Sequence, residues 1–119
     1  MSLSEREVGP VTIVTLSGNL TQGAAGDGLR DKVGSLLQQG RKDILVDLGA
    51  VPYMDSSGLG TLVAAYTTAR RQGGALKLLN LTKRLQDLLV ITKLANVFDC
   101  FEDETTAVSS FTSAARTGS

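Results

Sequence analysis

The residues best suited to chemistry gather in one segment, 53–60, which reads Tyr-Met-Asp-Ser-Ser-Gly-Leu-Gly. A carboxylate, Asp55, is followed there by the hydroxyls of Ser56 and Ser57. All three residues favour the start of a helix, where backbone N–H groups and the positive end of the helix dipole point outwards. A phosphate on Ser56 or Ser57 would be received by those groups. The segment therefore fits either a plain helix cap, which is the commoner case, or a phosphorylation site.

The chain lacks the residues on which most hydrolases and metalloenzymes depend. Its 119 residues include no histidine and one cysteine, Cys100. Without histidine, Ser-His and Cys-His pairs cannot form, and the commonest metal ligand is missing. An Asp55–Ser56 hydrolase pair would need an adjacent base, and only a lysine brought close by the fold could supply one. We therefore expect a binding protein rather than an enzyme.

The composition predicts a globular protein of the cytoplasm. Lysine plus arginine and aspartate plus glutamate number 12 each, so the basic excess typical of nucleic-acid binders is missing. The polar first residues do not form a signal peptide, and the longest uncharged stretch, 56–68, is too short to span a bilayer. We expect no direct contact with nucleic acid or membrane. A single cysteine allows no internal disulfide, and we expect Cys100 to be a small buried apolar residue.

The segment that carries Ser56 lies between a predicted strand and a predicted helix. Residues 43–48 form a nearly continuous apolar run, which is typical of a central parallel strand buried on both faces. Leu59, Leu62, Val63 and Tyr66 then follow helical spacing up to Gly73-Gly74. In open α/β sheets, ligands bind at the carboxyl ends of strands, which is where this segment falls.

Other strands and helices alternate along the chain and predict an α/β fold with a mixed, mostly parallel sheet of four to five strands and about four helices. Residues 1–119 read as a single domain, with a core over about 4–115 and a loose tail at 116–119. The remaining predicted strands are at 4–8, 11–16 and 75–79. Three further helices are predicted: one at 24–39, one after the capping residue Thr82, and one around Ala107, Phe111 and Ala114. A short apolar segment, Val97-Phe98 with Phe101, suits a last strand.

Motifs spread from Val11 to Ala107 follow the order of one known family. They are Asp-Ser-Ser-Gly-Leu-Gly at 55–60, Gln72-Gly73-Gly74 with Leu76-Lys77-Leu78, Asn80-Leu81-Thr82, and Ile91-Thr92-Lys93-Leu94 ahead of Val97-Phe98. Together they resemble the STAS domain of bacterial anti-sigma-factor antagonists. The resemblance implies the STAS fold and a non-enzymatic role in regulating transcription.

The resemblance also implies a switch at Ser56, with Ser57 as the second choice. In such antagonists the serine after the aspartate is phosphorylated by an anti-sigma factor that is also a serine kinase. The unphosphorylated antagonist binds that kinase and releases a sigma factor, phosphorylation breaks the complex, and a phosphatase reverses it. An added phosphate carries ~1.5–2 negative charges into the interface, next to Asp55. No cofactor or metal is implied in this chain, because ATP and magnesium belong to the kinase.

One loop departs from the family pattern. The family usually has Gly-Glu-Leu/Ile-Asp after its second strand, whereas residues 18–21 read Gly-Asn-Leu-Thr, so Asn19 and Thr21 replace two acidic residues. The change is also compatible with a sub-lineage of the family whose members act as constitutive scaffolds or as parts of a signalling complex without a standard kinase. The sequence is also compatible with a weak homodimer.

We expect the partner to bind Asn19, Thr21, Asp55, Ser56, Ser57 and Gly58, which belong to loop 18–22 and segment 55–58, together with the exposed side of the following helix. Gly58 and Gly60 have no side chain that would block a closely approaching partner. Lys83 and Arg84 could contact an acidic partner, but such charges more often form a solvated face. Asp47, at a strand end, fits a place near the site or an ordinary solvated position equally well.

Overall fold

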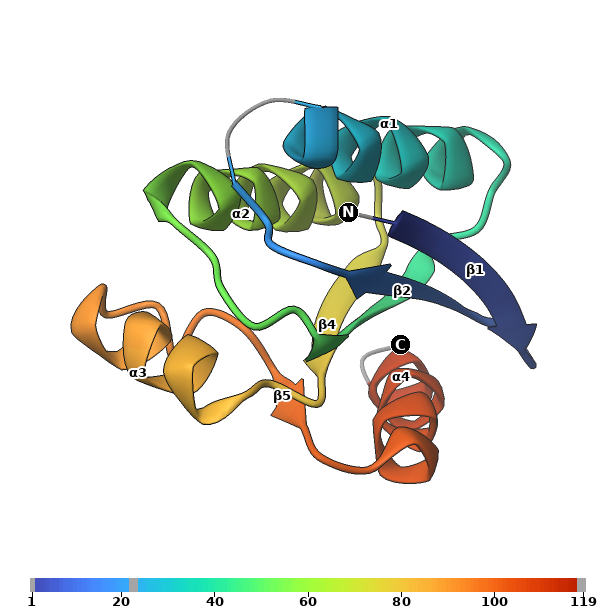
Figure 1. Cartoon of the computed structure of the whole chain (residues 1–119). Helices are drawn as coiled ribbons and strands as arrows, with labels where there is room; N and C mark the ends of the chain where they lie inside the picture. The colour runs from blue at the N-terminus through green and yellow to red at the C-terminus, as the bar shows by residue number, and fades with distance from the viewer. Residues whose placement is uncertain (1, 22–23, 118–119) are drawn as a thin grey trace.

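A computed structural model describes residues 2–21 and 24–117 of the chain, and within them it contains five strands and four helices. Strands and helices alternate from β2 onwards (Figure 1). In chain order they are β1 (Ser2–Val8), β2 (Val11–Ser17), α1 (Ala24–Gln38), β3 (Asp43–Ala50), α2 (Ser56–Arg71), β4 (Ala75–Leu79), α3 (Lys83–Ile91), β5 (Cys100–Phe101) and α4 (Glu104–Thr117).

The strands form one sheet in the order β1-β2-β3-β4-β5. The first pair is an antiparallel hairpin in which Val8 faces Val11 across a two-residue turn. Gly9 occupies that turn with φ +60, a conformation that glycine adopts without steric cost. The other three pairs are parallel, as the alternation of strands and helices predicts. The predicted mixed, mostly parallel sheet with four helices is confirmed.

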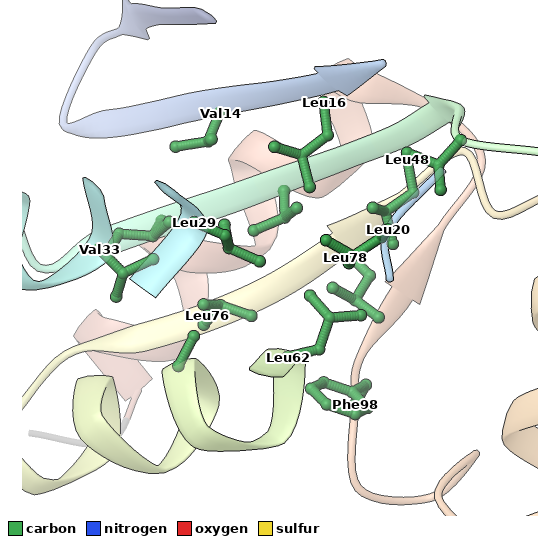
Figure 2. Close-up of a cluster of buried hydrophobic side chains, with 14 of the residues drawn as sticks. Val14, Leu16, Leu20, Leu29, Val33, Leu48, Leu62, Leu76, Leu78 and Phe98 are labelled. Atoms are coloured by element: carbon green, nitrogen blue, oxygen red, sulfur yellow. The ribbon is translucent and has the colours of Figure 1, made fainter. Parts of the chain in front are cut away.

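Helices cover both faces of the sheet. The larger core lies between the sheet and helices α1 and α2, with contributions from α3, and includes Leu16, Leu29, Leu62 and Leu78, each at most 1% exposed (Figure 2). Helix α4 covers the opposite face, where Ala107 and Phe111 pack on a smaller apolar cluster. Both residues belong to the predicted last helix, whereas the side chain of Ala114 lies outside the described residues. No helix in the described part of the chain is both long and apolar enough to cross a bilayer.

The last strand differs from its prediction. Val97 and Phe98 lie outside β5, which consists of Cys100 and Phe101 alone. Cys100 is exposed on this edge strand, so the expectation of a buried cysteine is wrong. Partial burial of the thiol raises the pKa of Cys100, and the neighbouring carboxylate of Asp99 raises it further. A strand at the edge of a sheet has no neighbour on its outer side, and this explains the exposure.

The described elements extend slightly beyond the predicted core of residues 4–115, and the single-domain assignment stays a prediction. Strand β1 begins at Ser2, before the predicted core boundary at residue 4, and α4 continues to Thr117, beyond the boundary at 115. Residues 118–119 lie outside the described part of the chain.

Candidate functional site

The segment around Ser56 is a capped helix start. Asp55 has extended backbone angles and is the N-cap of α2, with its Oδ1 accepting a hydrogen bond of 2.9 Å from the backbone N–H of Gly58. Ser56 and Ser57 are the first two residues of the helix, and both are exposed. An exposed hydroxyl in the first turn is accessible to a modifying enzyme. The Gly58 N–H, in contrast, already has an acceptor, so it is not available to a phosphate on Ser56.

The loop after β2 is attached directly to this segment. Leu20 and Met54 form an isolated parallel bridge, in which the Leu20 N–H donates to Tyr53 O at 3.0 Å and the Asp55 N–H donates to Leu20 O at 3.4 Å. The side chains of Leu20 and Met54 are buried, at 0% and 5% exposure, and join the larger core (Leu20 is labelled in Figure 2). The two loops are therefore held together by backbone hydrogen bonds and by apolar packing.

Gly58 has an internal reason to be glycine. A Cβ atom at this position would lie 2.1 Å from the carbonyl oxygen of Leu20, so any side chain would force the loop away from α2. A Cβ at Gly60 would meet nothing within 4 Å, and Gly60 is exposed. Of the two glycines, Gly60 alone has the open surroundings that the partner-access argument assumes. Gly58 is buried, so its position does not support the prediction that it contacts a partner.

The structure brings most of the predicted site residues together. The Leu20–Met54 bridge aligns Thr21 with Asp55 and Asn19 with Tyr53, and Asn19 is exposed whereas Thr21 is half-buried. Gln22, the last residue of the predicted loop, lies outside the described residues. That these residues bind a partner stays a prediction.

A second group near Ser56 was not predicted as part of the site. Tyr53 is 41% exposed, and the guanidinium of Arg84, from the first turn of α3, lies over its ring at 5.9 Å from the centroid. From the sequence, Arg84 was expected to contact an acidic partner or to belong to a solvated helix face, and no pairing with Tyr53 was predicted. The sequence does show an aromatic residue, Tyr53, two positions before Asp55, but its pairing with Arg84 depends on how α3 packs.

Asp47 is half-buried and ties two strand ends together. Its Oδ1 accepts hydrogen bonds from the Gly49 N–H at 2.9 Å and from Nδ2 of Asn80 at 3.3 Å. These partners give Asp47 a structural role at the ends of β3 and β4. Across the residues that the structure describes, cysteine, aspartate and glutamate do not gather in a group of three that could hold a metal ion.

Comparison with known proteins adds independent findings. The model of the STAS domain family matches residues 3–107. A curated relative from Bacillus subtilis, an anti-sigma-B factor antagonist, is 45% identical over 71 residues, which make up 60% of this chain and 64% of that protein. The match thus spans less than two thirds of the relative's length.

Solved structures share the fold at low sequence identity. A crystal structure from Thermotoga maritima has a TM-score of 0.84 at 20% identity, with 92% of this chain and 93% of that chain covered. SpoIIAA, a Bacillus cell fate determinant, in its phosphorylated form has a TM-score of 0.72 at 21% identity, with coverage of 91% and 97%. At these identities the likeness establishes the fold alone.

Proposed function

The chain belongs to the STAS domain family, and we propose that it is an anti-sigma factor antagonist, a binding protein switched by phosphorylation of Ser56. The observation that carries the proposal is the exposed hydroxyl of Ser56 in the first turn of α2, attached by the Leu20–Met54 bridge to the loop that presents the exposed side chain of Asn19. The B. subtilis relative supports the class of function.

In the unphosphorylated protein, the surface around Ser56 binds an anti-sigma factor and so releases a sigma factor. The surface offers Asn19, Thr21, Ser56 and Ser57, whose uncharged side chains cost less to bury than charged ones when the partner supplies hydrogen bonds. Asp55 keeps its carboxylate engaged by the Gly58 N–H, so the cap persists in the complex.

Phosphorylation is carried out by the partner, which is a serine kinase. The Ser56 oxygen bonds to the γ-phosphorus of ATP, the hydroxyl proton leaves, and ADP departs. The product carries ~1.5–2 negative charges at the first residue of α2, beside the Asp55 carboxylate. Repulsion and the cost of burying this charge then break the complex. Hydrolysis of the phosphate ester by a phosphatase restores binding.

Phosphosite mapping tests the switch. The protein is purified from its native host and its intact mass and phosphosites are compared for wild type, Ser56→Ala and Ser57→Ala. We expect a phosphate on wild type and on Ser57→Ala that is missing from Ser56→Ala. A phosphate that disappears only in Ser57→Ala would move the site to Ser57, and no phosphate under any growth condition would refute the switch.

A binding measurement tests the surface. Ser56→Asp should weaken binding of the anti-sigma factor about 10-fold or more, because a charge enters the interface. Ser109→Asp is the matched control, since Ser109 is an exposed serine of α4 on the opposite face of the sheet (Figure 1). If both variants bind like wild type, and Thr21→Arg does too, the proposed surface is wrong.

A constitutive scaffold is the second candidate function. The neutral Asn19 and Thr21 favour it, because they stand where the family usually has acidic residues. A scaffold would form a stable complex of high mass with other STAS domains, which gel filtration of host lysate detects, and it would carry no phosphate.

A further inference from the structure

A hollow of about 610 Å³ lies between the start of α2 and the outer side of α3. Both elements lie at the same end of the molecule, on the left in Figure 1. The hollow joins the proposed phosphorylation site to a helix that the sequence analysis had left outside the site. Its lining consists of Tyr53, Met54, Asp55, Ser56, Arg84, Asp87, Leu88 and Ile91.

The charges that line the hollow differ in how they are engaged. Asp55 caps α2 through the Gly58 N–H at 2.9 Å, and Asp87 lies 3.6 Å from the ammonium of Lys83. Arg84 is the cation of the lining, and its guanidinium lies over the Tyr53 ring. A cation–π contact at an exposed site is weak, so a better acceptor can take the guanidinium from the ring.

We propose that Arg84 binds the phosphate of phosphorylated Ser56 within this chain and leaves the Tyr53 ring when it does so. The inference rests on the proposed phosphorylation of Ser56. Ser56 and Arg84 line the same hollow, so a phosphate on the serine enters the space beside the guanidinium. Two parallel N–H···O bonds between a guanidinium and a phosphate are short, charge-assisted and geometrically specific.

At the helix start the phosphate meets one N–H group that is already engaged and one neighbouring carboxylate, so a cation beside it adds to its binding. The Gly58 N–H is occupied by Asp55, and the Asp55 carboxylate repels a neighbouring phosphate. Arg84 offsets that repulsion from the opposite wall of the hollow. Phosphorylation then alters two groups on this surface: a dianion appears at Ser56, and the face of Tyr53 is uncovered.

Lys83 provides a matched control on the same helical turn. Its side chain is 88% exposed, pairs with Asp87, and does not line the hollow. Removing Lys83 changes the net charge by the same amount as removing Arg84, so any difference between the two variants reports position and contact rather than overall charge.

The test uses the full chain with phosphoserine installed at Ser56 during translation, so that it depends on no kinase. Phosphorus NMR titrates the phosphate in the wild-type, Arg84→Ala and Lys83→Ala backgrounds. The second pKa of phosphoserine is about 6, and a nearby cation lowers it. We expect the second pKa of the phosphate to be lower by about 0.5 or more in the wild-type and Lys83→Ala proteins than in the Arg84→Ala protein. Equal values in all three proteins would overturn the proposal.

A second readout follows the Tyr53 ring. Its NMR resonances should move on phosphorylation of the wild type and stay in place in Arg84→Ala, where the guanidinium is already missing. In Arg84→Lys the phosphate pKa should lie between those of wild type and Arg84→Ala, because an ammonium restores the charge but cannot form the two parallel hydrogen bonds of a guanidinium. Ring resonances that move equally in wild type and Arg84→Ala would contradict the exchange of partners. Absence of phosphate in the host would refute the proposed switch while leaving this titration unaffected.

Discussion

Gly58 and Gly60 stand two residues apart in α2, yet their surroundings predict opposite effects of the same substitution. In Gly58→Ala the new Cβ would lie 2.1 Å from the backbone oxygen of Leu20, and backbone gives way less easily than a side chain. We expect a loss of about 2–3 kcal/mol in the free energy of unfolding. Gly60→Ala meets nothing within 4 Å and should gain up to ~1 kcal/mol from helix propensity.

Urea unfolding of the two variants and wild type checks this pair of predictions. A Gly58→Ala protein as stable as wild type would show that the loop at Leu20 can move away from α2 at little cost. In that case the contact between the loop and the start of α2 would be looser than the hydrogen bonds at Leu20 indicate.

Single residues also mark where sequence reasoning succeeded and where it failed. Thr82 was predicted as a cap and Asp55 as one of three residues suited to a helix start, because a cap depends on the residue and the next few positions; both side chains accept backbone hydrogen bonds. Cys100 was misplaced, because its exposure depends on which strand lies at the edge of the sheet. The pairing of Arg84 with Tyr53 was missed for a similar reason, since it joins two segments far apart in the sequence.

At the scale of elements, Lys77 links strand β4 to helix α4. Its side chain is 9% exposed, its Nζ donates to Ser110 Oγ at 3.0 Å, and the ammonium lies 4.8 Å from the Phe111 ring centroid. Lys77→Ala should lose about 2–3 kcal/mol, because it removes packing, a hydrogen bond and a desolvated cation–π contact. Lys77→Met keeps the apolar stem and should lose roughly half as much.

Urea unfolding checks this prediction, with Lys83→Ala as the control. Lys83 is 88% exposed, so its removal should change the free energy of unfolding by less than ~0.5 kcal/mol. A Lys77→Ala protein that behaves like Lys83→Ala would mean that α4 is held by its apolar residues alone.

The start of α4 should also make stability depend on acid pH. Hydrogen bonds from the backbone and side chain of Thr106 lower the pKa of Asp103, and the guanidinium of Arg6 lowers the pKa of Glu104. A lowered pKa in the folded state stabilises the fold above the ordinary pKa of the carboxyl group. That contribution is lost as the pH falls through the folded value, roughly between pH 5 and pH 2.

Urea midpoints measured across this range check the effect. Asp103→Asn keeps an oxygen that can cap the helix but no longer titrates, so its stability should fall less steeply with acid than that of wild type. Glu104→Gln should reduce the slope in the same direction. If stability falls with pH as steeply in both variants as in wild type, Asp103 and Glu104 are not the source of the acid dependence.

The elements with a recognisable apolar pattern were predicted well, including the five-residue strand β4, whereas the two-residue strand β5 was not. The larger core and helices α1 and α2 follow from apolar spacing, since a helix or strand must bury such a face. Strand β5 has two residues, too few for any pattern, and it exists because its backbone pairs with β4. The hollow beside Ser56 depends on the packing of α3 against segment 53–56, and no local pattern contains that information.

At the scale of the whole molecule, the sheet separates two apolar clusters of unequal size. Helices α1, α2 and α3 enclose the larger one, whereas α4 covers the smaller one by itself. We expect α4 to open locally at a lower free energy than the central strands, because its detachment exposes the smaller cluster and leaves the larger one intact.

Native-state hydrogen exchange tests this difference. Amides of α4 should exchange faster than those of β2 and β3, and Lys77→Ala should accelerate the exchange of α4 while leaving β2 and β3 nearly unchanged. Equal protection throughout would mean that both clusters unfold as one cooperative unit.

The order of strands has a consequence for how the protein is made. Every ladder joins strands that are consecutive in the sequence, from β1-β2 at one edge to β4-β5 at the other. Each new strand leaving the ribosome therefore finds its neighbour already synthesised, and no early strand waits for a distant partner. The sheet can grow from one edge while translation continues, so that few unpaired strands are exposed to other nascent chains in the cell.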